Sequence, residues 1–180
     1  IFFIYSLNGW AVTDGNKQSN DTGFILHTTN GGDNWVVQFL HPDDINVIQF
    51  TDVMTGYAGG GFGRAVFFRT TNGGINWDTT RPFGSNMYTI LGLQFINKDT
   101  GWICSDDSFG GGVYRTTNGG INWEQQAPAS NEPIKLFFTD SNTGWFIGKD
   151  TQGRLFKTTN SGVNWNLHTL FGTNLGNIYF

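Results

Sequence analysis

The stretch Thr70-Thr71-Asn72-Gly73-Gly74-Ile75-Asn76-Trp77 occurs again, residue for residue, at 116–123. Two variants of it stand at 28–35, which reads TTNGGDNW, and at 158–165, which reads TTNSGVNW. The tryptophans that end these four copies are 42, 46 and 42 residues apart. A nearly constant period of this length indicates a chain built from repeated structural units.

A second landmark precedes each copy of the motif. A glycine followed by an aromatic residue recurs, and a phenylalanine stands seven residues before each of these aromatics. The aromatics are Trp10, Tyr57, Trp102 and Trp145, and the phenylalanines are Phe3, Phe50, Phe95 and Phe138. Phe180 occupies the same phase of a fifth copy. Because all seven tryptophans fall at these two landmarks, we expect them to be structural.

Each period predicts four short strands. In the second copy, apolar and β-branched stretches at 45–51, 55–60, 65–71 and 75–80 are separated by Gly, Asn and Asp. Four antiparallel strands in every 40–45 residues are typical of a β-propeller, in which neighbouring blades cover each other's faces. The prediction is therefore an all-β fold with four four-stranded antiparallel blades.

The predicted repeats cover the whole chain. Their approximate limits are 1–44, 45–88, 89–132 and 133–176, and 177–180 begins a fifth. We expect these blades to be part of a larger propeller. A closed four-bladed ring and an eight-bladed ring of two copies are the alternatives.

The repeated motif is expected to have a structural role at the turn between the third and fourth strands. The Asn side chain can accept hydrogen bonds from backbone amides, the second glycine can adopt positive φ, and the Trp can cover the turn. The predicted structural residues are Asn30, Gly32, Trp35, Asn72, Gly74, Trp77, Asn118, Gly120, Trp123, Asn160, Gly162 and Trp165.

These segments resemble Asp-box (bacterial neuraminidase) repeats, whose pattern is Ser/Thr-x-Asp-x-Gly-x-Thr-Trp. The Gly-aromatic landmark with its upstream Phe resembles the photosystem II assembly factor type of propeller. The resemblance covers essentially the whole chain, although Asn replaces the Asp in every copy. It implies a fold rather than a function, because such repeats occur in sialidases, xyloglucanases, sorting receptors and assembly factors. It also implies that any ligand binds on the face opposite the repeated turns.

Composition narrows the range of partners. Only 13% of residues are charged, the net charge is -4, and basic residues form no block. Nucleic acids and anionic membranes are therefore poor partners. No run of about 18 apolar residues predicts membrane insertion. Cys104 is the only cysteine, so no internal disulfide forms. Low charge with abundant Asn and Thr favours a bacterial exported protein.

The loops that differ most between copies predict a binding face. Loops that join the second strand to the third, and one blade to the next, share one end of a propeller and commonly carry function. The binding residues predicted there are Arg64, Arg81, Tyr88, Asp106, Asp107, Phe109 and Arg154.

No complete catalytic or metal site is found. A sialidase needs a Tyr–Glu nucleophile pair, and the only glutamates, Glu124 and Glu132, have no such context. A glycosidase remains an alternative, because it needs only two suitably separated carboxylates. Asp43 or Asp44 could form such a pair with Asp106 or Asp107. The three histidines lack ligand spacing, and 106–108 is a weak calcium candidate. We predict no cofactor and no bound metal.

One basic position also recurs, directly before each Thr-Thr-Asn segment. It is occupied by His27, Arg69, Arg115 and Lys157. One hypothesis is an arc that docks an acidic partner. The favoured one is structural pairing with Asp52, Asp99 or Asp140.

The sequence thus favours a non-enzymatic propeller module that presents a rigid face to a protein or glycan partner. The alternative is a glycan-active hydrolase, sialidase-like or xyloglucanase-like, whose site is incomplete in this chain. Self-association through open blade edges is a further possibility.

Overall fold

The computed structural model describes residues 1–13, 22–83, 87–105, 111–128, 132–149 and 154–170. These residues form sixteen strands in four four-stranded antiparallel sheets, and none of them is helical. The predicted all-β class and four-stranded blades are confirmed. No described segment is a helix long and apolar enough to cross a membrane.

Each sheet, called a blade from here on, is built from four consecutive strands. Blade 1 contains β1 (Phe2–Phe3), β2 (Gly9–Thr13), β3 (Gly23–Thr28) and β4 (Val36–His41). Blade 2 contains β5 (Ile45–Phe50), β6 (Gly56–Gly60), β7 (Val66–Thr70) and β8 (Asp78–Thr80). Blade 3 contains β9 (Gly92–Phe95), β10 (Gly101–Ser105), β11 (Gly112–Thr116) and β12 (Glu124–Pro128). Blade 4 contains β13 (Pro133–Phe138), β14 (Gly144–Gly148), β15 (Arg154–Thr158) and β16 (Asn166–Leu170).

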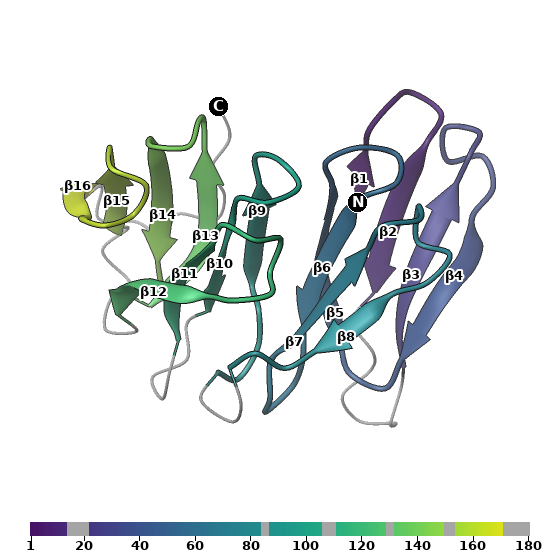
Figure 1. Ribbon diagram of the computed structural model, residues 1–180, viewed down its shortest axis with the longest axis horizontal. Helices are drawn as coiled ribbons and strands as arrows, with labels where there is room; N and C mark the ends of the chain where they lie inside the picture. The colour runs from purple at the N-terminus through teal and green to yellow at the C-terminus, as the bar shows by residue number, and fades with distance from the viewer. Residues whose placement is uncertain (14–21, 84–86, 106–110, 129–131, 150–153, 171–180) are drawn as a thin grey trace.

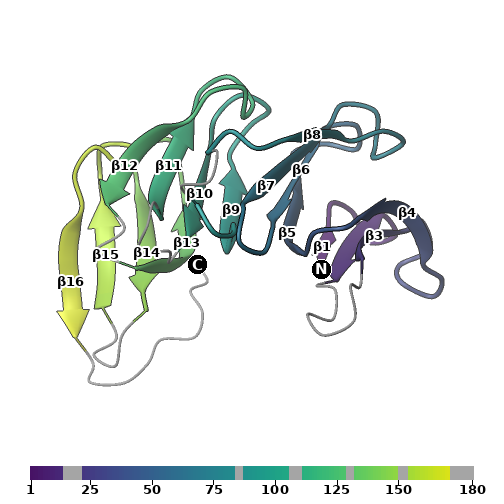
Figure 2. The ribbon, with the colours of Figure 1, turned by 90° about the horizontal axis from the view of Figure 1, so that it is seen from below.

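The blades follow one another in chain order and fan out as an arc (Figures 1 and 2). The first strand of each blade lies on the inside of the arc, where β5 contacts β1 and β9, and β9 contacts β13. The fourth strands β4, β8, β12 and β16 form the outer edges. The second strands of blades 2 and 3 are buried along their whole length, because a neighbouring blade covers each of their faces.

An aromatic stack joins consecutive blades. Trp10 of blade 1 lies on Phe50 of blade 2, with ring centroids 3.6 Å apart. Tyr57 lies on Phe95 in the same way at 3.6 Å, and Trp102 on Phe138 at 3.7 Å. Each of these three phenylalanines is only 2% exposed. The two sequence landmarks are therefore the two halves of one inter-blade contact.

The glycine of the Gly-aromatic landmark makes room for this phenylalanine. Gly56 pairs across the sheet with Phe50, and a Cβ on Gly56 would lie 2.6 Å from the Phe50 ring. Equivalent clashes would occur at Gly9, Gly101 and Gly144. The phenylalanine ring thus folds over a bare backbone, which explains why a glycine precedes each stacking aromatic.

Glutamine side chains tie two of the junctions further. Gln49 donates to the carbonyl oxygen of Phe95 at 2.9 Å and accepts from its amide at 2.6 Å. Gln94 makes the same two bonds with Phe138, at 2.8 and 2.6 Å. The side-chain amide thereby pairs with the backbone of the next blade as a strand would.

One predicted boundary is wrong. The fourth strand of blade 2 was expected to begin at Ile75, but β8 begins at Asp78. The turn occupies the intervening residues, and Ile75 is 75% exposed at its tip.

Candidate functional site

The repeated Thr-Thr-Asn turns share one hydrogen-bond network. In blade 2, the Thr70 hydroxyl donates to the Asn72 side-chain oxygen at 3.0 Å and accepts from the Gly74 amide at 2.9 Å. The same Asn72 oxygen accepts from the Asn76 amide at 3.0 Å. All four blades repeat these bonds within 0.1 Å. Gly32, Gly74, Gly120 and Gly162 all have positive φ, between 85° and 100°.

The tryptophan that ends each turn packs edge-on against the phenylalanine of its own blade. The centroids of Trp77 and Phe50 are 5.8 Å apart with the rings at 87°. The same edge-on contact joins Trp35 to Phe3, Trp123 to Phe95 and Trp165 to Phe138. These residues build the scaffold and present no reactive group.

The recurrent basic residues lie opposite aromatic residues of the neighbouring strand. Each is the cross-strand partner of a stacking aromatic, as in the pairs Trp10–His27, Tyr57–Arg69, Trp102–Arg115 and Trp145–Lys157. The Lys157 ammonium is 5.2 Å from the Trp145 ring centre, and the Arg115 guanidinium 5.7 Å from that of Trp102. Such cation–π contacts stabilise the pairs.

The favoured pairing with Asp52, Asp99 and Asp140 is therefore wrong. Within the described ranges, Asp99 pairs with Lys98. Asp52 and Asp140 instead accept hydrogen bonds from backbone amides of their own hairpin turns. The cause is the register of the second and third strands, which sets each cation directly across from an aromatic ring.

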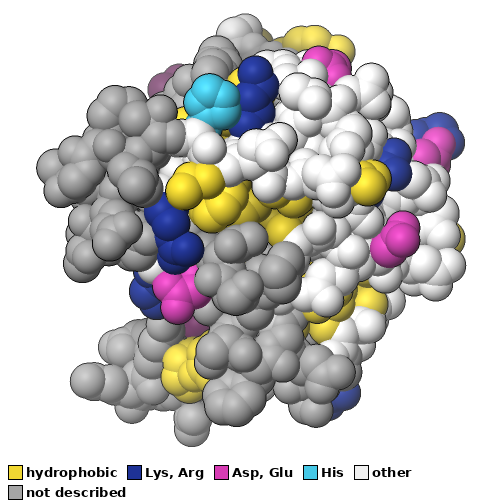
Figure 3. Space-filling model, turned by 90° about the vertical axis from the view of Figure 1, so that its left-hand side faces the viewer, with side chains coloured by type: hydrophobic (Ala, Val, Ile, Leu, Met, Phe, Trp, Pro, Cys, Tyr) yellow, Lys and Arg dark blue, Asp and Glu magenta, His cyan; other side chains and the backbone are white. Residues whose placement is uncertain are grey.

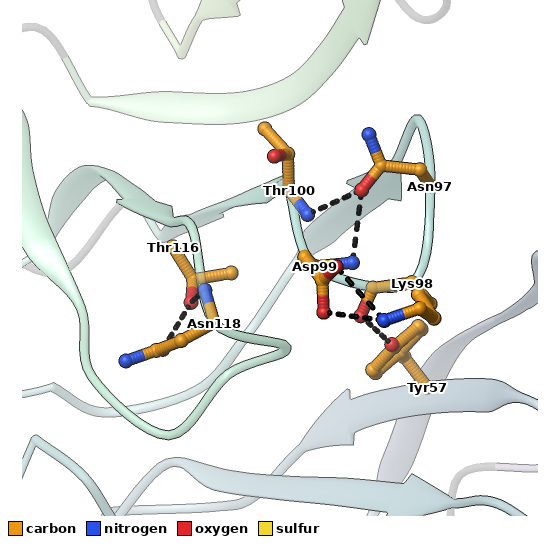
Figure 4. Close-up of polar contacts among 7 residues, drawn as sticks. All are labelled: Tyr57, Asn97, Lys98, Asp99, Thr100, Thr116 and Asn118. Atoms are coloured by element: carbon orange, nitrogen blue, oxygen red, sulfur yellow. Dashed lines mark hydrogen bonds and ion pairs between the residues drawn. The ribbon is translucent and has the colours of Figure 1, made fainter.

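Figure 4 shows the equivalent hairpin turn of blade 3, where Asn97 takes the place of the aspartate. Its side-chain oxygen accepts from the amides of Asp99 and Thr100 at 2.9 and 2.8 Å. Tyr57 reaches this turn from blade 2 and donates its hydroxyl hydrogen to the Lys98 carbonyl. Burial raises the pKa of the Tyr57 hydroxyl, which keeps it neutral as a donor.

A more promising site lies where three loop segments meet at the opposite end of blade 2. The Gly61 amide donates to the Asp44 carbonyl at 2.9 Å, and the Ala65 amide donates to the Met87 carbonyl at 2.8 Å. These backbone bonds fasten the 61–65 loop to both linkers that flank the blade. We call this region the loop face and define it by His41, Asp43, Phe62, Arg64, Arg81 and Tyr88.

Charged groups on the loop face are fixed by their neighbours. Arg81 donates to the Asp43 carboxylate and, at 2.9 Å, to the Arg64 carbonyl. His41 lies 3.4 Å from the same carboxylate. Burial lowers the pKa of His41, Asp43 acts to raise it and Arg81 to lower it, and the net pKa is below the ordinary value. The imidazole is thus neutral near pH 7.

Beside these charges, two aromatic side chains point into solvent. Phe62 is 55% and Tyr88 41% exposed, and their rings meet edge to face with centroids 5.1 Å apart. They come from different loops, so the pair marks the contact between the 61–65 loop and the linker that leads to blade 3.

The structure brings together part of the predicted binding set. Arg64, Arg81 and Tyr88 all belong to the loop face. Arg154 begins β15 in blade 4, where its guanidinium lies 5.9 Å from the Phe156 ring centre. Asp106, Asp107 and Phe109 lie outside the described residues. Sequence reasoning missed Phe62, although an aromatic between glycines in a loop was a usable signal.

Apolar exposure is not confined to the loop face. The outer side of blade 4 also shows hydrophobic side chains beside basic ones (Figure 3). Val163 and Leu167 of this blade are 64% and 51% exposed. In the part of the chain that the structure describes, no three His, Cys, Asp or Glu residues are grouped to hold a metal ion.

Solved structures with the same arrangement of blades are known. YCF48 bound to D1 peptide is similar at 23% identity and a TM-score of 0.55, over 68% of this chain and 38% of that one. An ancestral GH74 enzyme matches at 19% identity and a TM-score of 0.63, over 93% and 26%. The GH74 enzyme of Niastella koreensis matches at 17% identity and a TM-score of 0.62, over 89% and 28%. No protein-family model and no curated protein matches the chain.

The fold is a β-propeller. At these identities the likeness establishes the propeller fold alone. The chain spans 26% to 38% of the length of the three propeller structures.

Proposed function

We propose that this propeller is a non-enzymatic binding module that docks a protein partner on its loop face. The observation that carries the proposal is the exposed Phe62–Tyr88 pair beside Arg64 and Arg81. Aromatic residues and arginine are enriched at the centres of protein interfaces, where they supply most of the binding energy.

The rigidity of the loop face supports the same function. Backbone hydrogen bonds and the Arg81–Asp43 ion pair hold the three segments in place before any partner arrives. A preformed surface loses little conformational entropy on binding, so more of the contact energy appears as affinity. One of the similar structures, YCF48, is bound to a peptide, which favours a protein partner over a glycan.

The rival function is hydrolysis of a glycan, as the GH74 neighbours suggest. A pair of catalytic carboxyl groups must face the cleft, one as acid and one as base or nucleophile. Asp43, one of the predicted candidates, is engaged by Arg81 and lies beside His41. Asp44 is only 8% exposed. These placements favour binding over catalysis.

The turn motif and the sequence composition suggest two finer assignments. We infer that the Thr-Thr-Asn turns are Asp-box repeats in which the Asn side-chain oxygen replaces the Asp carboxylate as the hydrogen-bond acceptor of the turn. The low charge supports an exported protein. Both are compatible with a partner bound at the end of the blades opposite the turns.

The test is selection of partners from a random peptide library displayed on phage, followed by affinity measurement with the synthetic peptides. Phe62→Ala combined with Tyr88→Ala is expected to weaken binding at least tenfold. Tyr5→Ala is the matched control, because Tyr5 is 66% exposed in blade 1, away from the loop face. Circular dichroism confirms that each variant is folded.

Two outcomes contradict the proposal. One is equal affinity of the double variant and the control for the selected peptides. The other is release of reducing sugar from xyloglucan, or cleavage of sialosides, by the purified chain.

A further inference from the structure

The two exposed aromatic rings of the loop face form an angular apolar surface. Phe62 and Tyr88 meet edge to face, with their ring planes at 73° and their centroids 5.1 Å apart. Both side chains remain accessible to solvent. Rings set at this angle offer an incoming group two apolar walls instead of one flat surface. A group that contacts both walls must be compact and apolar on two sides.

Glycines fix the position of the Phe62 wall. Gly61 and Gly63, on either side of Phe62, both have positive φ, at 105° and 76°. A Cβ on Gly61 would overlap the Arg64 carbonyl oxygen, so only glycine fits this close turn. The Tyr88 ring lies 3.8 Å from the position of a Cβ on Gly63, against the bare backbone. The loop therefore has one shape, and Phe62 projects from a fixed place.

Hydrogen bonds also fix the linker that carries Tyr88. The Ile90 amide donates to the Gly60 carbonyl at 3.1 Å. The Asn46 side chain donates to the Thr89 hydroxyl at 2.8 Å. Since Gly60 ends β6 and Asn46 belongs to β5, the second wall is anchored in the same sheet as the first.

The backbone groups at the base of the loop are already used within the protein. The amides of Gly61 and Ala65 donate to the carbonyls of Asp44 and Met87, and the Arg64 carbonyl accepts from Arg81. An incoming segment is therefore offered no strand edge at these residues, and its own backbone stays hydrated. Polyproline II is the extended conformation that has no internal hydrogen bonds and a fully solvated backbone.

Charge does not favour an acidic segment at this surface. Arg81 already donates to the Asp43 carboxylate and to the Arg64 carbonyl. A carboxylate of the partner would have to compete with Asp43 for the same guanidinium. The group that meets the two aromatic walls is therefore expected to be uncharged.

We propose that the loop face binds a proline-rich segment of its protein partner in the polyproline II conformation, with a proline ring between Phe62 and Tyr88. This rests on the binding function proposed above and names the chemistry of the partner. Proline is compact and apolar, and it has no backbone N–H that would need an acceptor. The conformation is preformed, and aromatic-lined surfaces recognise it in other proteins. The Tyr88 hydroxyl can donate to a carbonyl of the segment.

The probe is the acetylated peptide Ser-Gln-Pro-Pro-Gln-Pro-Pro-Gln-Ser, compared with two peptides in which leucine or glutamate replaces every proline. Each is titrated into the full chain, and the amide chemical shifts of Gly61, Gly63 and Ala65 are followed by NMR. The proline peptide is expected to shift these resonances and to bind at least fivefold tighter than the other two. Equal or tighter binding of either comparison peptide, or no shifts with the proline peptide, overturns the proposal.

Single variants test the two walls separately. Phe62→Ala and Tyr88→Ala should each weaken the proline peptide at least fivefold, and the fold should persist because both side chains are exposed. Tyr88→Phe keeps the wall and should retain more affinity than Tyr88→Ala. Tyr5→Ala, at an exposed site of blade 1, should leave the affinity unchanged. Unchanged affinity in both wall variants overturns the proposal.

The peptides selected on phage separate this proposal from the proposed function. Selected peptides that need Phe62 and Tyr88 but contain no proline would leave the docking function standing and overturn the proline-rich partner. If neither the selected peptides nor the proline peptide depend on the two aromatics, both proposals are wrong.

Discussion

At the scale of single residues, the first threonine of each Thr-Thr-Asn segment contributes more to the turn than the sequence pattern predicts. Sequence reasoning assigned the turn to Asn, Gly and Trp. The structure adds Thr28, Thr70, Thr116 and Thr158, each 1% or 2% exposed and bonded to both the Asn side chain and a turn amide. Their role was hidden because threonine is also an ordinary strand residue.

Thr70→Val tests this role with almost no change of shape. The variant loses the hydroxyl and leaves the buried Gly74 amide without its acceptor. A stranded buried group costs about 1–3 kcal/mol, so the free energy of unfolding should fall by about that amount in urea titrations. Thr71→Val, at the exposed neighbour, should change it little. Equal stabilities of the two variants would show that the hydroxyl is unimportant.

The hairpin aspartates make a small part of the stability depend on pH. Burial acts to raise the pKa of Asp52, but the Met54 and Thr55 amides outweigh it, and the pKa is lowered. The Asn142 and Thr143 amides likewise lower the pKa of Asp140. A carboxyl with a depressed folded-state pKa stabilises the fold above its unfolded pKa, near 3.9, and loses that contribution as pH falls through the folded value.

Replacing both carboxylates with Asn should therefore remove an acid-sensitive contribution. The Asp52→Asn, Asp140→Asn variant should melt below the wild type at pH 7, and the gap should close below about pH 4. Asn97 provides the natural control, since it makes the same bonds without a charge. A gap that stays constant from pH 7 to pH 2 in calorimetry would contradict this account.

At the scale of elements, the sequence period predicted the positions of the strands well but the contacts between blades poorly. The expected strands at 45–51 and 65–71 correspond to β5 and β7 within one residue at each end. The link from Gln49 to Phe95 could not be read from spacing, because it joins residues 46 positions apart in different blades. The loop face was anticipated through Arg64, Arg81 and Tyr88, but their meeting depends on backbone bonds between loops that no periodic pattern encodes.

Gln94→Met tests the glutamine link to blade 4. Methionine preserves the length of the side chain but loses both bonds to the Phe138 backbone. The free energy of unfolding should drop by about 2 kcal/mol, and the Phe138 amide should exchange its hydrogen faster. Gln126→Met is the control, since the hydrogen bond of the Gln126 side-chain amide is to the Glu124 carbonyl of its own strand. Similar losses in both variants would contradict a specific link.

At the scale of the whole molecule, the three junctions share one construction and should fail together. Each contains a stacked aromatic pair whose phenylalanine is 2% exposed. Cys104 is completely buried and packs with Trp102, Phe138 and Phe146 at the third junction. Its thiol therefore reports when that junction opens.

Labelling of Cys104 by a thiol reagent should begin only when the whole chain unfolds. Its midpoint in urea should coincide with that of tryptophan fluorescence, because all three junctions are built on the same kind of stacked aromatic pair. Labelling at urea concentrations where the fluorescence is still native would show that blade 4 separates first.

The stack of one aromatic on the next blade's phenylalanine also bears on how such chains change length. Every repeat carries one phenylalanine that stacks with the preceding blade and one aromatic that stacks with the following blade. Gaining or losing a complete repeat by gene duplication or deletion therefore leaves every remaining aromatic with a stacking partner. A gain of half a repeat would leave an aromatic without a phenylalanine to stack on, and the inter-blade contact would be lost. Recombination within this sequence should thus be tolerated only in whole units of about 44 residues, and the identical turns at 70–77 and 116–123 are the expected trace of such an event.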